Sequence, residues 1–152
     1  MLREGERLRS LGLDIGDKRI GVALSDALGI LASPLLVFEH TNDQTDITTI
    51  LDIVSKYSVE CIIVGIPRSL NGTMGLQAEK VRAFADKLIE KSPVPVQYRD
   101  ERLTTVTAKS LHEESSRKKS TQIKRIEYDA MAAAVILQSF LNETRPLEYP
   151  PE

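Results

Sequence analysis

Leu-Gly-Leu-Asp-Ile-Gly-Asp-Lys-Arg-Ile-Gly-Val-Ala occupies residues 11–23 of the chain. Its two apolar halves predict neighbouring buried strands that are joined by a tight polar turn. Asp14 stands where the first strand ends, and the nearby glycines allow another group to approach the backbone closely. Lys18 and Arg19 add positive charge beside that carboxylate. The combination is typical of proteins that handle phosphate esters, because a metal ion needs oxygen ligands and an anionic substrate needs cations.

The composition bounds the class of protein. The chain has 152 residues, of which 41% are hydrophobic, and this predicts one domain over residues 1–142 followed by a C-terminal tail over residues 143–152. Its net charge of −2 excludes a polycation, so nucleic-acid binding would need a local basic patch. The single cysteine, Cys61, lies in an apolar run, which excludes a disulfide framework and favours a buried thiol. Because neither a signal core nor a membrane span is visible, we expect a cytoplasmic protein.

Hydrophobic periodicity predicts three strands with short turns, followed by alternating helices and strands. The first three strands are expected to form an antiparallel meander, and the uninterrupted apolar run at residues 61–66 is typical of a buried parallel strand. The expected architecture is a mixed five-stranded sheet with helices on both faces, an order that suits the ribonuclease H-like fold. The predicted strands are residues 9–13, 19–25, 30–39, 61–66 and 94–99, and the predicted helices are residues 42–57, 77–90, 104–114 and 124–142.

Three carboxylates fall where core elements are expected to meet at one end of the sheet. Asp14 ends the first strand, Glu101 ends the fifth, and Asp129 lies in the last helix. An isolated ionised carboxylate on an apolar helix face costs several kcal/mol, and a bound cation would remove that cost. Counting by three and four from Asp129 reaches such a face, which is formed by Ala132, Ala133, Ile136 and Phe140.

Each carboxylate also has a simpler interpretation. Asp14 could serve only the turn that follows it, and Asp129 could be an ordinary helix-start residue. Glu101 could be an exposed charge or could pair with Arg102. Asp100 competes with Glu101 for the same role, because strand alternation puts the two side chains on opposite faces.

Two further polar segments could contact an anion. The loop at residues 65–75 follows a buried strand and precedes a helix, so helix-start N–H groups could meet a phosphate there, although its spacing alone favours an ordinary loop. A stretch with five cations and no acid is either a solvated loop or a contact to a phosphate backbone; these cations are Arg117, Lys118, Lys119, Lys124 and Arg125. His40 and His112 are isolated, and we expect them at the surface or on a helix face without a role.

Four motifs in this order resemble those of the YqgF family, also called RuvX-like Holliday junction resolvases or pre-16S rRNA nucleases. The likeness extends from about Leu8 to Leu141. The motifs are Asp14-Ile-Gly-Asp-Lys-Arg-Ile-Gly-Val-Ala, then Gly65-Ile-Pro with Asn71-Gly and Gly75, then Asp100-Glu-Arg-Leu-Thr-Thr, and finally Asp129-Ala-Met-Ala-Ala.

The resemblance implies a ribonuclease H-like fold and a metal-dependent nuclease that trims the 5′ end of ribosomal RNA precursors. It implies that Asp14, Glu101 and Asp129 form an acidic triad. Two Mg²⁺ or Mn²⁺ ions about 4 Å apart would suit this chemistry, with Asp14 bridging them. The expected partners are nucleic acid and a ribosomal particle, and the chain would act as a monomer or homodimer without a membrane. The residues expected to contact nucleic acid are Lys18, Arg19, Arg68, Asn71, Arg102, Arg117, Lys118, Lys119, Lys124 and Arg125.

Three other functions compete with this interpretation. A DNA junction resolvase would use the same acids. A non-catalytic nucleic-acid-binding factor could keep the fold without cleaving. Half of an actin-like ATPase would share the Asp-x-Gly pattern at Asp14, but the chain is too short for a second lobe. The residues leave the choice between RNA and DNA open, and likewise the choice between endonuclease and exonuclease action.

Overall fold

The computed structural model describes residues 9–67, 75–100 and 121–144. In the last of these segments, side chains are described only at residues 130–143. All predicted elements within these ranges are confirmed, with boundaries that shift by a few residues. The predicted helix at residues 104–114 lies outside the described residues. The elements are β1 (Ser10–Ile15), β2 (Arg19–Ser25), β3 (Ala32–Glu39), α1 (Asp43–Lys56), β4 (Cys61–Ile66), α2 (Leu76–Lys91), β5 (Val96–Asp100) and α4 (Thr121–Thr144).

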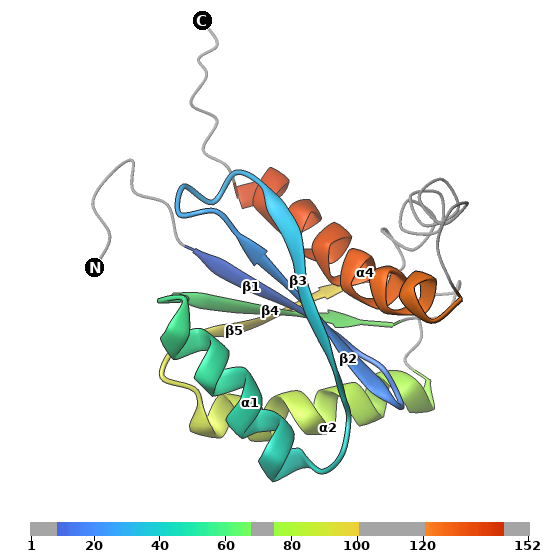
Figure 1. The fold of residues 1–152 in the computed structure, drawn as a ribbon. Coiled ribbons are helices and arrows are strands. Elements are labelled where there is room, and N and C mark those ends of the chain that lie inside the picture. Colours follow the sequence, from blue (N-terminus) through green and yellow to red (C-terminus); the bar gives the residue numbers. More distant parts are fainter. Residues whose placement is uncertain (1–8, 68–74, 101–120, 145–152) are drawn as a thin grey trace, which may run out of the picture.

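The five strands form one mixed sheet in the order β3-β2-β1-β4-β5 (Figure 1). The pairs β1–β2 and β2–β3 are antiparallel, as predicted for the meander. The pairs β1–β4 and β4–β5 are parallel. The carboxyl ends of β1, β4 and β5 therefore lie at the same end of the sheet, and β2 begins at that end.

Helices cover both faces of the sheet, which confirms the expected layers (Figure 1). Leu11, Leu13 and Ile15 of β1 pack with residues of α1 and α2 in the larger core. Side chains alternate along a strand, so Gly12 and Asp14 lie on the opposite face, which α4 covers and which we call the α4 face. The smaller core on that face joins Cys61 and Ile63 of β4 to the apolar residues of α4, Ala133, Ala134, Ile136, Leu137 and Leu141.

The hairpin between β2 and β3 forms one margin of the sheet. β3 is an edge strand and contains Pro34, as the sequence predicts, and the pairing register with β2 shifts between Val22 and Ala23. In the turn, the Asp26 carboxylate accepts hydrogen bonds from two backbone N–H groups, those of Ile30 at 2.8 Å and Leu31 at 3.2 Å.

No helix within residues 9–67, 75–100 and 121–144 is both long and apolar enough to cross a membrane.

Candidate functional site

Asp14 occupies a position with open backbone on both sides. It is half-buried on the α4 face, near the end of β1. Its partner on the neighbouring antiparallel strand is Gly21. On the other side, Gly65 follows Val64, the residue of β4 that pairs with Leu13. Neither glycine has a side chain, so a ligand could approach the Asp14 carboxylate across both flanking strands.

The turn after β1 brings two cationic residues to the end of the sheet at which Asp14 lies. The Gly16 N–H donates to the Arg19 carbonyl at 2.9 Å, and the His40 N–H donates to the Lys18 carbonyl at 2.8 Å. A Cβ added at Gly16 would lie 2.7 Å from the Arg19 carbonyl oxygen, so the turn requires glycine there. Lys18 is exposed and Arg19 is half-buried. The structure thus brings these two predicted residues close to the end of the strand that carries Asp14.

The helix α4 approaches β1 closely at Gly12. A Cβ added at Gly12 would lie 2.8 Å from Leu137 Cβ and 2.9 Å from the Ala133 carbonyl oxygen. Real Cβ atoms almost never come this close to other atoms. The missing side chain at Gly12 therefore lets the backbone of α4 rest directly on the sheet.

The direction of α4 determines which end of the sheet its first turns reach. Gln138 hydrogen-bonds with the backbone of Ile30 and Ala32, beside the end of the sheet where β1 begins. α4 consequently runs antiparallel to β1, and its first turns extend toward the end where β1 finishes (Figure 1).

The backbone of α4 brings position 129 level with Asp14. The Gly12 contact is centred between Ala133 and Leu137, and residue 129 precedes that centre by six residues, about 9 Å along the axis. Asp14 follows Gly12 by two strand residues, about 6.6 Å in the same direction. Positions 14 and 129 therefore differ by about 2.4 Å in height along β1, which is less than one strand residue.

The strand β5 separates the two acidic candidates at its end. Asp100 pairs with Ile66, whose side chain belongs to the core beneath α1 and α2, and Tyr98 packs against the same core. Asp100 thus lies on the face opposite Asp14. Arg99 lies on the α4 face, where its guanidinium donates hydrogen bonds to Ser139. Glu101 lies outside the described residues.

Several predicted site residues are not described in their side chains, so the acidic triad stays a prediction. Among the described residues, no three His, Cys, Asp or Glu side chains form a group that could hold a metal ion. The predicted residues outside the described ranges are Glu101, Arg68, Asn71, Arg102, Arg117, Lys118 and Lys119. Lys124, Arg125 and Asp129 lie in α4, where only the backbone is described at these positions.

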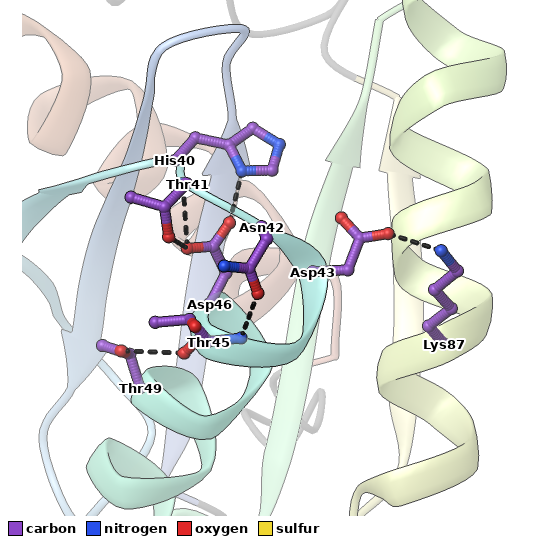
Figure 2. A network of polar contacts seen from close by, with 8 residues as sticks. All are labelled: His40, Thr41, Asn42, Asp43, Thr45, Asp46, Thr49 and Lys87. Carbon is purple, nitrogen blue, oxygen red and sulfur yellow. Dashed lines mark hydrogen bonds and ion pairs between the residues drawn. The ribbon is translucent and has the colours of Figure 1, made fainter.

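His40 is neither isolated nor on a helix face, so this part of the expectation is wrong. His40 lies between β3 and α1, its side chain is 22% exposed, and its Nδ1 pairs with the carboxylate of Asp46, which is 1% exposed (Figure 2). The other Asp46 oxygen accepts hydrogen bonds from the N–H and hydroxyl of Thr41 at 3.2 and 3.1 Å. The His40 ring also packs edge-on against Phe84. One sequence signal could have found this pair, because Asp46 precedes Ile50 by one turn on the buried side of α1.

Cys61 is buried, as predicted. Desolvation by burial raises the pKa of its thiol. A nucleophilic role is excluded, because a nucleophilic cysteine needs an accessible thiolate.

Comparison with solved structures supports the fold. The structure of T. thermophilus RuvC in complex with a Holliday junction substrate matches with a TM-score of 0.59 and 11% identity, over 92% of this chain and 98% of that one. The Fowlpox virus resolvase, solved in complex with Holliday junction DNA, matches with a TM-score of 0.56 and 12% identity, over 91% and 99% of the two chains. These likenesses concern the fold alone, and they confirm the expected ribonuclease H-like architecture.

Comparison of sequences gives the family. A protein of Desulforamulus reducens named "Putative pre-16S rRNA nuclease" is 47% identical over 135 residues, covering 89% of this chain and 97% of its own. A protein of Clostridium acetobutylicum with the same name is 42% identical over 137 residues, covering 89% and 98%. Both names denote nucleases. The family profile RuvX, described as Holliday junction resolvase, matches residues 8–143. This chain therefore belongs to the RuvX family, the one that its four motifs resemble.

Proposed function

We propose that this chain is a metal-dependent nuclease that hydrolyses phosphodiester bonds in the 5′-end processing of pre-16S ribosomal RNA. The observation that carries the proposal is the position of Asp14. Its carboxylate is half-buried between two glycine-bearing strands and lies beside a turn with two cationic residues. A structural turn residue would not need this open backbone on both sides. A carboxylate that binds a metal ion next to a substrate phosphate would need it.

The donor set suits Mg²⁺ or Mn²⁺, which prefer hard carboxylate oxygens. In the proposed site Asp14, Glu101 and Asp129 would hold the ions. The alternation of β5 favours Glu101 over Asp100, because Asp100 lies on the face away from Asp14. Divalent ions held by these residues would supply activation of a water molecule and stabilisation of the leaving oxygen.

The protein's own contribution is to orient the substrate and to balance its charge. Lys18 and Arg19, at the same end of the sheet as Asp14, are proposed to bind the phosphates that flank the scissile bond. The remaining predicted nucleic-acid contacts, at residues 68, 71, 102, 117–119, 124 and 125, would bind the backbone of the RNA.

The names of the sequence relatives favour a ribosomal RNA precursor as substrate. Such a substrate places the proposed enzyme in the cytoplasm, in contact with a precursor ribosomal particle. The second candidate is a Holliday junction resolvase, which the description of the family favours. The two candidates share the proposed carboxylates and differ in the nucleic acid that reaches them.

A cleavage assay separates these candidates. The full chain is incubated with end-labelled RNA that spans the 5′ leader of 16S rRNA, with single-stranded DNA and with a four-way DNA junction. Each reaction contains Mg²⁺, Mn²⁺ or EDTA. We expect cutting of the RNA that depends on the metal. Cutting of the junction alone would transfer the assignment to the resolvase. Binding without cutting, both of the free RNA and of precursor particles, would leave a non-catalytic binding factor.

A further inference from the structure

Arg99 joins β5, which directly precedes Glu101, to α4, which contains Asp129. It is the next-to-last residue of β5, and it reaches across the α4 face to α4. Its side chain is only 15% exposed. The guanidinium donates to Ser139 Oγ from Nε at 3.2 Å and from Nη2 at 2.7 Å, and Nη2 also pairs with the carboxylate of Glu143.

The geometry of this contact is specific to arginine. Ser139 and Glu143 are four residues apart, so they lie one above the other on the same side of α4. A planar guanidinium presents several N–H donors in a fixed arrangement and can therefore hold two successive turns at once. A lysine ammonium could keep the charge but would lack this fixed arrangement.

Arg99 makes a polar contact that holds α4 on the side of β5, while Gln138 holds it to the backbone beside β3 and apolar side chains pack it against the sheet, β4 included. The close contact at Gly12 is centred between Ala133 and Leu137. A helix anchored near its C-terminal end on the β3 side alone could still swing about the Gly12 contact, and an anchor on the β5 side opposes that swing. Arg99 thus limits rotation of α4 about the contact at Gly12.

The consequence at the other end of α4 follows from helix geometry. From the centre of the Gly12 contact, Ser139 lies about 6 Å in one direction and residue 129 about 9 Å in the other, at 1.5 Å per residue. A displacement of about 1 Å at Ser139 would then move residue 129 by about 1.5 Å the opposite way. Misplacement of a catalytic group by about 1 Å can reduce the rate about 10²-fold.

We propose that Arg99 is a positioning residue for the nuclease site. It acts through Ser139 and Glu143, sets the angle of α4 across the sheet, and thereby sets the separation between Asp129 and Asp14. In this proposal it acts through α4 and not by contact with substrate or metal. The inference rests on the proposed function, since only a site built from both α4 and β1 is sensitive to this angle.

Three variants test the role. Arg99→Met keeps a long apolar side chain without donors, Arg99→Lys keeps the charge, and Ser139→Ala removes one acceptor. We expect kcat for RNA cleavage to fall about 10- to 100-fold in Arg99→Met, while KM changes less than about 3-fold. Mn²⁺ binding, followed by electron paramagnetic resonance, is expected to weaken about 10-fold. Arg99→Lys should recover only part of both losses, and Ser139→Ala should show a smaller loss of the same kind.

The matched control removes a cation from a different contact between elements. Lys87 of α2 pairs with Asp43 of α1 at 2.6 Å, on the face of the sheet away from α4. Lys87→Met should leave kcat and Mn²⁺ affinity within about 2-fold of the wild-type values, because the pair is exposed and lies away from the site. An equal loss in Lys87→Met would reduce the effect of Arg99 to general stability.

A distance measurement tests the angle of the helix without relying on activity. Spin labels are attached to cysteines introduced at two exposed positions, Asn142 in α4 and Glu60 before β4, while the native cysteine is buried. Arg99→Met should shift or broaden the distance distribution, and Lys87→Met should not. An unchanged distribution in folded Arg99→Met would overturn the positioning role even if the wild type cleaved no RNA. Wild-type protein that cleaves no nucleic acid, with a shifted distribution in Arg99→Met, would overturn the proposed function instead.

Discussion

Replacing Gly12 with alanine tests the close approach of α4 to the sheet. The new methyl group would lie 2.8 Å from Leu137 Cβ and 2.9 Å from the Ala133 carbonyl oxygen. Ordinary contacts between such atoms need about 3.5–4.0 Å, so α4 would have to move away by about 0.6–1.2 Å. Overpacking of this kind costs about 1–3 kcal/mol. For a chain of this size we expect the Tm to fall by about 4–8 °C at 2 kcal/mol.

Urea unfolding of the wild type and Gly12→Ala measures this cost directly. Gly75→Ser is the control, because Gly75 caps α2 and a Cβ added there meets nothing within 4 Å. Serine is a preferred N-cap residue, so we expect no loss of stability in the control. The displaced helix should also slow RNA cleavage by Gly12→Ala about 10- to 100-fold. A free energy of unfolding within about 0.5 kcal/mol of the wild type would refute the close approach of α4.

Three further predictions follow from single contacts. His40→Ala removes one partner of the buried Asp46 carboxylate and should lower the free energy of unfolding by about 2–3 kcal/mol in urea titrations, whereas His40→Ala combined with Asp46→Asn should recover part of this loss. Desolvation opposes the shift at Asp26, but the hairpin N–H groups outweigh it and lower the pKa of the carboxyl below 3.8. This stabilisation is present above the unfolded pKa and is lost as the pH falls through the folded value, so the stability difference between wild type and Asp26→Ala should be smaller at pH 2.5 than at pH 7. The Cys61 thiol should react with Ellman's reagent at pH 8 only after unfolding, because it is buried and its pKa is raised.

Local pattern was sufficient to predict most of the fold. The strands at residues 19–25 and 61–66 were predicted with the bounds that the structure shows, because their apolar runs end at clear polar or proline residues. The layers followed from the order of elements and from the burial of β4 on both faces. The contact between Arg99 and α4 could not be predicted, because it joins residues that are 40 or more positions apart in the chain.

The candidate site shows the limit of the same reasoning. Asp46 and Asp129 both lie at apolar-face positions of a helix by sequence spacing, and this pattern suggests a bound cation for either one. In the structure, Asp46 obtains its partners from His40 and Thr41. A carboxylate on an apolar face therefore has two explanations, and only the three-dimensional neighbours distinguish them. For Asp129, the level of its backbone beside Asp14 favours the metal.

The central claim, that Asp14 is the catalytic carboxylate of a metal-dependent nuclease, is tested most directly by one pair of variants. Asp14→Asn and Asp100→Asn each replace one carboxylate at the same end of the sheet, but on opposite faces. Cleavage of end-labelled 16S leader RNA in Mn²⁺ is measured for both variants and for the wild type, after equal unfolding midpoints have been established. We predict that Asp14→Asn loses at least about 10³-fold in rate and that Asp100→Asn stays within about 3-fold of the wild type. Cleavage by folded Asp14→Asn at the wild-type rate would contradict the catalytic role of Asp14.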